Sequence, residues 1–235
     1  MNLYELAYAC YLYGHFTNFD ISYDRFLRAT APSFDMQSGA HRKALLKWLN
    51  SWGCRQFAKD FHAQASENLK HWHEDNEHLL PQLGKQLLDL SGDELDSAKM
   101  AYGSLVDVQA SLRRRGSNEF SKSVGPTGAA KILFALRKDA FPPWDIKIRK
   151  RLGYDGVSPS YKKYLKDVQE ILHQLKAECQ KHGTELSKLP QTLGRPSSSL
   201  VELVDEYNWI TITNSCPPPS LNCLEMWYRW AGGIG

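Results

Sequence analysis

The sequence contains no apolar run long enough to span a membrane and no segment typical of a secretory signal. Its first eight residues, Met-Asn-Leu-Tyr-Glu-Leu-Ala-Tyr, include Glu5 and no basic leader. The few cysteines are odd in number and scattered, which is typical of reduced thiols rather than of a disulfide framework. They are Cys10, Cys54, Cys179, Cys216 and Cys223. We therefore expect a cytoplasmic protein, nucleoid-associated if bacterial, without membrane contact.

Common catalytic signatures are also missing. The chain has no Gly-x-Ser-x-Gly elbow, no phosphate-binding P-loop and no dinucleotide-binding fingerprint. It has no internal repeat and no low-complexity segment. His71, Glu74, Asp75 and His78 share one helical face, a spacing that can bind zinc but is more often a solvated polar surface. We expect no metal site there.

Helical periodicity dominates what is present. Apolar residues recur at intervals of three and four, as at Leu45, Leu46 and Leu49, and no run of alternating strands appears. The pattern predicts an all-α fold, with helices near residues 2–13, 21–29, 40–52, 56–73, 76–90, 94–114, 127–137, 146–152, 159–182, 198–208 and 220–231. Residues 211–213 suit an extended conformation but have no obvious partner strand.

Positive charge is concentrated in one segment. The 235 residues carry a net charge of +3, but residues 113–166 contain fourteen basic and four acidic residues and therefore carry +10. The remainder carries −7. Such a segment is typical of a protein that binds a polyanion, although an ordinary solvated basic surface gives the same composition.

One stretch inside this segment combines a turn with a lone carboxylate. Residues 123–152 run from a Gly-containing turn into an apolar helix, through Pro-Pro-Trp, to Asp145 at the head of a basic helix. Backbone N–H groups at such a turn can bind a phosphate. Asp145 is a favoured helix N-cap, which is a purely structural role, but a carboxylate there also stays available for chemistry. The combination indicates chemistry beside a nucleic-acid backbone.

These thirty residues resemble the helix-hairpin-helix DNA glycosylases of the endonuclease III, adenine glycosylase and alkyladenine glycosylase superfamily. The family reads Leu-Pro-Gly-Val-Gly-Arg-Lys-Thr-Ala, an apolar helix, and then Val-Asp-Thr-His-Val. Here the turn is Ser123-Val124-Gly125, and the aspartate motif is Trp144-Asp145-Ile146. The resemblance implies one domain of two helical lobes flanking a cleft. Residues 30–150 would form the central lobe, with the hairpin near 121–130, and residues 1–29 and 151–235 the second lobe.

The resemblance also implies an activity, namely flipping a damaged or modified base out of duplex DNA and hydrolysing its N-glycosidic bond with Asp145. Thr127 stands where bifunctional members carry a Schiff-base lysine, so a monofunctional enzyme that leaves an abasic site is expected. Lys131 lies one turn further on and can reach the site. Ser123 replaces the usual first glycine of the turn.

Further site residues follow from the same resemblance. Those expected to bind DNA are Lys122, Ser123, Val124, Gly125, Thr127, Gly128, Lys131, Lys147 and Arg149. The turn carbonyls can hold a monovalent cation. No other cofactor is expected, and only Cys216 and Cys223 lie near each other, so an iron–sulfur cluster lacks ligands.

The duplex-invading wedge is expected near Ser51, Trp52 and Arg55, about seventy-five residues before the hairpin. Alternatively, Trp48 and Trp52 form a core pair. Trp144, beside the aspartate, is expected to line the base pocket.

No residue identifies the excised base. The sequence leaves open repair or defence against modified viral DNA. The alternative from another class is a non-catalytic helix-hairpin-helix DNA-binding module in which Asp145 only caps a helix. In either case we expect a monomer bound to double-stranded DNA.

Overall fold

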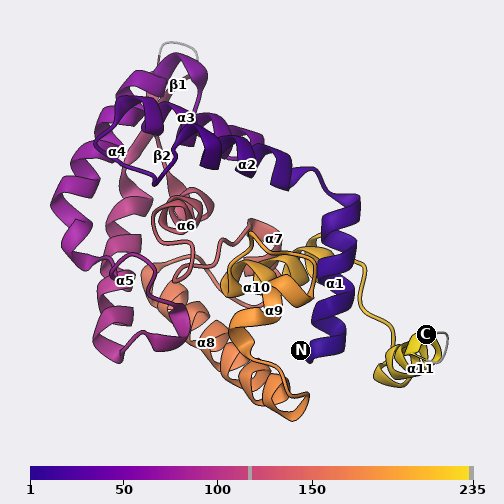
Figure 1. The fold of residues 1–235 in the computed structure, drawn as a ribbon. Helices are drawn as coiled ribbons and strands as arrows, with labels where there is room; N and C mark the ends of the chain where they lie inside the picture. Colours follow the sequence, from indigo (N-terminus) through magenta and orange to yellow (C-terminus); the bar gives the residue numbers. More distant parts are fainter. Residues whose placement is uncertain (116–117, 233–235) are drawn as a thin grey trace.

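The computed structural model describes residues 1–115 and 118–232, most of which are helical (Figure 1). The prediction of a mainly helical protein is confirmed. The helices are α1 (Leu3–Phe16), α2 (Phe19–Ala29), α3 (Gly39–Ser51), α4 (His62–Asn76), α5 (Gly92–Asp107), α6 (Gly125–Leu136), α7 (Ile146–Arg151), α8 (Ser158–Lys181), α9 (Leu189–Thr192), α10 (Leu200–Asn208) and α11 (Leu221–Gly232). None of those described is both long and apolar enough to cross a membrane.

Local sequence explains where several helices begin. Asn2, Ser91 and Ser199 each cap a helix through a capping box, in which the cap side chain and a glutamate three residues later satisfy each other's backbone N–H groups. The glutamate of α10 is Glu202, which is therefore fixed at the first turn of that helix. These caps place the acidic residues of α10 in a defined register.

Two expected helices are wrong. Residues 76–90 do not form one helix, because Pro81 and Gly84, with φ of +80°, interrupt the chain. Only short 3₁₀ turns remain there, at Glu77–Leu79 and Leu87–Asp89. The helix expected over 94–114 ends at Asp107.

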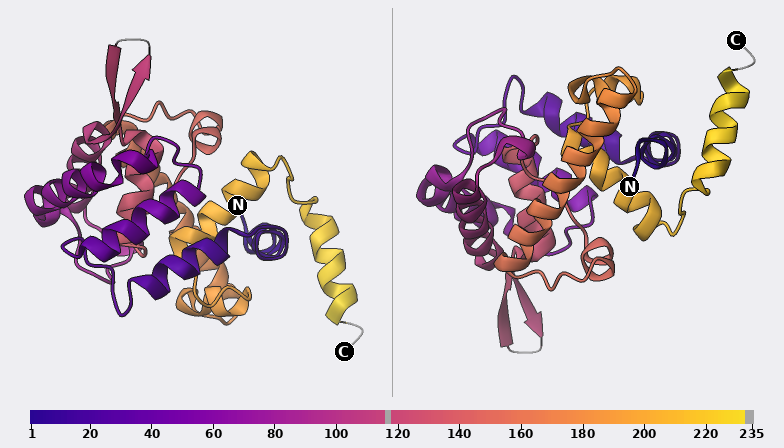
Figure 2. Two further views of the ribbon diagram at one scale, coloured as in Figure 1. Left: turned by 90° about the horizontal axis from the view of Figure 1, so that it is seen from above. Right: turned by 90° about the horizontal axis from the view of Figure 1, so that it is seen from below.

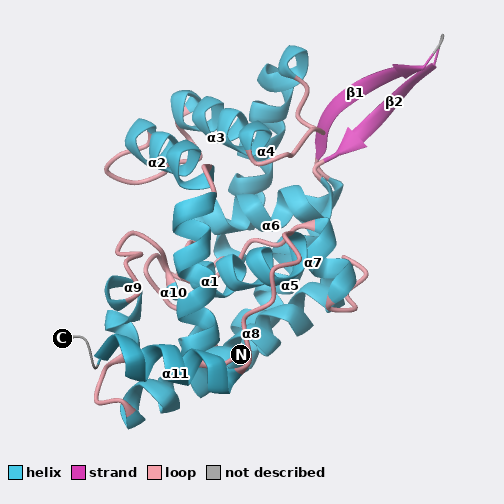
Figure 3. Cartoon of the chain, turned by 90° about the vertical axis from the view of Figure 1, so that its right-hand side faces the viewer, coloured by secondary structure: helices cyan, strands magenta, loops and turns pink. Residues whose placement is uncertain are grey.

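A β-hairpin replaces the end of that second helix. Strands β1 (Gln109–Arg115) and β2 (Asn118–Ser123) pair antiparallel, with Arg113 opposite Phe120. Arginine is a good helix former, so local propensity favoured a helix, and pairing with a later segment overrides it. The hairpin projects from the helical body (Figures 2 and 3).

The helix-hairpin-helix motif is consequently not formed as expected. β2 ends at Ser123, and α6 begins at Gly125, so a strand rather than a helix precedes the turn. The apolar helix after the turn is present. Residues 211–213 are also not extended, because Trp209–Thr213 form a π-helical turn that continues α10, hereafter the π-turn.

Helix α6 lies at the centre of the packing. Most of its residues are buried, and it packs against α5 and α3. α1 packs against α10 and the π-turn, so segments from the two ends of the chain meet. However, α2 packs on α3 and α8 on α5, and one hydrophobic core extends through these elements. The division into two lobes therefore remains a prediction.

Candidate functional site

A pocket of about 400 Å³ lies between α6, α7 and α10. The end of α3, together with residues of α1 and α2, completes its wall. Its aromatic lining residues are Tyr13, Phe19, Trp52, Trp144 and Trp209. Its polar lining residues are Gln56, Thr127, Lys131, Asp145, Lys147, Asp205 and Thr213. The volume and the mixture of aromatic and polar groups suit a small, flat organic ligand.

Asp145 is the N-cap of α7, and both of its carboxylate oxygens are engaged. Oδ1 accepts a hydrogen bond from the backbone N–H of Ile148 at 2.8 Å, and Oδ2 accepts one from the Thr213 hydroxyl at 3.0 Å. The capping role predicted from the sequence is confirmed. Thr213 was not identified from the sequence, because it is sixty-eight residues away and reaches Asp145 only through the π-turn.

Lys131 lies inside the pocket rather than on a DNA-facing surface. Its side chain, on α6, is 7% exposed, and Nζ donates to the carbonyl oxygen of Trp52 at 2.6 Å. Nζ also lies 5.2 Å from the centre of the Trp52 ring, within range of a cation–π interaction. The structure brings Lys131 to the same cavity as Asp145, and its contact with DNA remains a prediction.

Asp205 is a pocket residue that the sequence did not reveal. Its Oδ1 is buried and has no hydrogen-bond partner in the described part of the chain. Burial raises the pKa of this carboxyl well above its usual value, the negative charge of Asp145 raises it further, and Lys131 opposes the shift. The sequence feature that could have indicated Asp205 is a group of three acidic residues in the mainly apolar helix α10, namely Glu202, Asp205 and Glu206.

The predicted wedge residues divide between core and surface. Trp48 is buried in the core, with its ring 4.7 Å from that of Trp52. Trp52 donates from Nε1 to the Ser22 hydroxyl at 3.0 Å and forms part of the pocket wall. The two tryptophan rings are in contact, but Trp52 also lines the pocket, so its role in the base pocket or wedge remains a prediction. Ser51 and Arg55 are exposed beside the pocket, so their role as a wedge remains a prediction.

Trp144 is fully buried, and its ring stacks on Tyr164 at 4.9 Å. Its indole N–H donates to the carbonyl oxygen of Pro126 at 3.3 Å. This contact ties the loop before Asp145 to the first turn of α6. Trp144 therefore lines the pocket and also supports it structurally, and its role in a base pocket remains a prediction.

The turn before α6 is held by packing as much as by glycine flexibility. Gly125 has φ of +68°, a conformation that favours glycine. A Cβ on Gly128 would lie 2.5 Å from Nε2 of Gln56, which donates to the Val124 carbonyl oxygen at 2.6 Å. Val124 and Gly128 are buried, and a phosphate contact through the backbone N–H groups of the turn remains a prediction.

Two carbonyl oxygens of this turn are already engaged inside the protein, that of Val124 by Gln56 and that of Pro126 by Trp144. The cation expected at the turn remains a prediction. Among the residues described, no group of three or more His, Cys, Asp or Glu side chains is arranged to hold a metal ion.

The basic residues expected to bind DNA have different positions. Lys122 is exposed on β2, and Lys147 is exposed at the pocket rim, with Nζ 3.3 Å from the Thr213 carbonyl oxygen. Arg149 is buried, lies 5.7 Å from the Trp144 ring and donates to the Asp155 carbonyl oxygen at 3.2 Å. The guanidinium supports the loop after α7, and its contact with DNA remains a prediction.

Comparison with known proteins adds no relative: no family model, no curated protein and no solved structure matches the chain. The proposed function therefore depends on the residues of the pocket.

Proposed function

We propose that this protein is a DNA glycosylase that flips a damaged or modified base into the pocket and cleaves its N-glycosidic bond. The observation that carries the proposal is the position of Asp145, which is oriented by two hydrogen bonds in an aromatic-lined cavity within the +10 segment. The size of the cavity is suited to a nucleobase.

The chemistry assigned to Asp145 follows from the charge that bond cleavage develops. As the N-glycosidic bond breaks, the sugar acquires oxocarbenium character, and a fixed carboxylate stabilises that positive charge. The same carboxylate accepts a proton from the attacking water. The Ile148 N–H and the Thr213 hydroxyl hold Asp145 in one orientation, so little reorganisation is needed during the reaction.

The β-hairpin and the start of α6 supply a surface for the duplex. Arg113 and Lys122 are exposed on the hairpin, and Phe120 is 52% exposed. A two-stranded ribbon fits a DNA groove, and an exposed ring can stack against bases. Gln56 connects this surface to the pocket, because its carbonyl oxygen accepts from the Ser111 hydroxyl at 2.7 Å.

The test is abasic-site formation on genomic and phage DNAs of differing base modification. Asp145→Asn is expected to lower excision by about 10²–10³-fold. Duplex affinity should be unchanged or higher, because a negative charge is removed from a basic surface. Asp93→Asn, an exposed carboxylate on α5, is the matched control. Wild-type excision by Asp145→Asn would refute the mechanism.

The choice of DNA also separates repair from defence. Excision confined to phage DNA with modified bases supports an antiviral enzyme, whereas excision from oxidised, deaminated or alkylated genomic DNA supports repair. If no DNA yields abasic sites but duplex binding persists, the protein is the non-catalytic DNA-binding module considered above.

A second candidate is a bifunctional glycosylase, favoured by the position of Lys131 in the same cavity as Asp145. In that reaction Nζ attacks the anomeric carbon, the base leaves, and the resulting imine permits β-elimination. Thr127 also lines the pocket, but its hydroxyl cannot form an imine.

Borohydride trapping distinguishes the two candidates. The monofunctional proposal predicts intact abasic strands and little covalent adduct. Abundant adduct that is lost in Lys131→Ala, but retained in Thr127→Ala, would establish Lys131 as the nucleophile.

A further inference from the structure

The carboxyl group of Asp205 is an unexplained polar group in the pocket wall. Oδ1 is buried without a hydrogen-bond partner in the described residues, although buried polar groups in folded proteins are nearly always paired. The residue as a whole is only partly buried, and it lines the pocket. The carboxyl group of Asp205 therefore borders the cavity.

An unpaired buried oxygen is far less costly on a neutral acid than on a carboxylate. In the neutral form Oδ1 is a carbonyl oxygen, and Oδ2 carries the proton and can donate it into the cavity. The structure thus favours a protonated side chain that presents an O–H group to whatever occupies the pocket.

We infer that Asp205 is the general acid of the reaction, donating the proton that the departing base takes up as its bond to the sugar breaks. This inference rests on the proposed glycosylase function. The substrate class that it assigns is a neutral nucleobase with a nitrogen or carbonyl oxygen acceptor directed at α10, because such a base leaves poorly as an anion.

The electron pair of the C1′–N bond moves to the base, and the base takes the proton from Oδ2, which leaves Asp205 ionised. Water bonds to C1′ and loses a proton to Asp145, and exchange with solvent restores both groups. The two carboxyls therefore begin the reaction in opposite protonation states, as in other enzymes in which environment separates an acid from a base.

The groups around Asp205 keep its proton in place. Asp145 on the N-terminus of α7 and Glu206 on α10 repel a second negative charge, while Lys131 on α6 attracts one. Tyr13 on α1 and Tyr164 on α8 also face Asp205, and both carry raised pKa values because they are buried. Burial of Asp205 has the largest effect and, together with the two carboxylates, raises its pKa and favours the neutral acid over the carboxylate.

The decisive experiment compares leaving groups in single-turnover excision by wild type, Asp205→Asn and Asp145→Asn. The duplexes carry one uracil, hypoxanthine or 8-oxoguanine, which are neutral bases, or one 7-methylguanine, which is cationic and departs without needing a proton. Asp205→Asn is nearly isosteric and can donate a hydrogen bond but no proton.

Asp205→Asn is expected to slow release of a neutral base by about 10²–10³-fold and to leave release of 7-methylguanine within threefold of wild type. The wild-type rate for the neutral base should fall as pH rises through the folded-state pKa of Asp205, and this fall should be absent in Asp205→Asn. Glu202→Gln removes another buried carboxyl, outside the pocket, and should leave the pH profile unchanged.

Equal losses on neutral and cationic bases would refute the acid role and indicate positioning instead. If Asp145→Asn abolishes excision while Asp205→Asn behaves as wild type, only this inference fails. If no duplex is cleaved by the wild type, both the function and the inference fail.

A second measurement needs no activity. The free energy of unfolding of wild type should decline relative to that of Asp205→Asn as pH rises from about 4 toward the folded-state pKa. A constant difference would show that Asp205 is ionised throughout and would overturn the proposal.

Discussion

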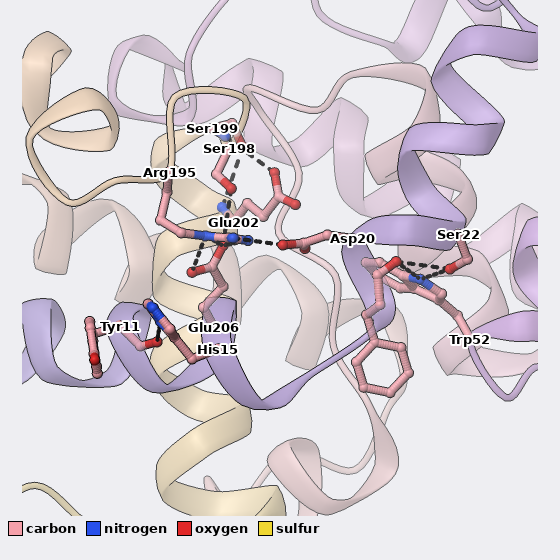
Figure 4. A network of polar contacts seen from close by, with 11 residues as sticks. Tyr11, His15, Asp20, Ser22, Trp52, Arg195, Ser198, Ser199, Glu202 and Glu206 are labelled. Carbon is pink, nitrogen blue, oxygen red and sulfur yellow. Dashed lines mark hydrogen bonds and ion pairs between the residues drawn. The ribbon is translucent and has the colours of Figure 1, made fainter.

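Asp205 and Glu206 are consecutive residues of α10, yet their carboxyl groups have opposite surroundings. Glu206 is 1% exposed and accepts hydrogen bonds from Arg195 at 2.9 and 3.1 Å and from the Ser198 hydroxyl at 3.0 Å (Figure 4). Arg195 also pairs with Asp20 at 2.6 Å. Asp205, on the pocket side, has a buried oxygen that no residue within 1–115 or 118–232 pairs with.

The carboxyl group of Glu206 has a structural role, whereas that of Asp205 borders the pocket and is available to a ligand. The Arg195 cluster, meaning Arg195, Glu206, Asp20 and Ser198, ties the loop before α10 to the start of α2. Arg195 also lies 5.4 Å from the ring of Tyr13, whose side chain lines the pocket. The cluster therefore holds one pocket wall in place, while Asp205 bears the cost of a buried oxygen that no described residue pairs.

The largest expected effect is the loss of stability when the Arg195 cluster is broken. Arg195→Met should lower the free energy of unfolding by about 3–5 kcal/mol, because Glu206 is left buried without its partner. Thermal unfolding measures the loss. Lys188→Met breaks an exposed ion pair with Glu185 and should cost less than about 1 kcal/mol. Equal effects of the two variants would remove the distinction between buried cluster and surface pair.

Glu202 tests whether the free energy of unfolding depends on pH through a buried acidic residue of α10. Burial, followed by the negative charge of Glu206, raises the pKa of Glu202 to about 8. Because the folded-state pKa lies above the usual value of 4.5, the stabilisation present in acid is lost as pH rises toward 8.

The slope attributable to this one group is at most about 1.4 kcal/mol per pH unit. Chemical denaturation of Glu202→Gln should show a flatter pH dependence than wild type, while glutamine preserves the capping box with Ser199. An unchanged slope would mean that Glu202 is paired in a way that keeps its pKa ordinary.

Removing the carboxyl group should change the free energy of unfolding in opposite directions at Asp205 and at Glu206. Asp205→Leu is expected to raise the free energy of unfolding by about 1–2 kcal/mol at neutral pH, since an unsatisfied buried group is replaced by an apolar one. Glu206→Leu should lower it, because Arg195 loses its principal partner. Destabilisation by both variants to the same extent would contradict the comparison.

The smallest effect concerns the hairpin, which belongs to neither side of α10. Duplex affinity should fall with salt with a log–log slope on the order of −4 or steeper. Lys122→Glu should make this slope shallower by about 1. Phe120→Ala should weaken binding without changing the slope.

Thermal stability should remain that of wild type in both hairpin variants, because the two side chains are exposed. Lys188→Glu, on a surface remote from the hairpin, is the control for charge reversal. An affinity that is independent of salt would exclude the proposed DNA surface.

Only part of the candidate site could be placed from the sequence, namely the part that local rules determine. Asp145 before a basic helix, the glycine at the turn and the apolar α6 were all identified from neighbouring residues. The hairpin was missed because Arg113 and its neighbours favour a helix locally, while strand pairing depends on residues 118–123. The burial of Arg149 was not foreseen, because it depends on the later loop at Asp155.

The sequence alone determined that the chain is mainly helical, that its positive charge is concentrated around one turn, and that Asp145 caps a helix. Only the tertiary structure decided that Lys131 points into the cavity, and that Asp205 rather than Glu206 faces it. Helical periodicity specifies the angle between neighbouring side chains, but not which of them meets Arg195. That choice depends on packing between segments that are distant in the chain.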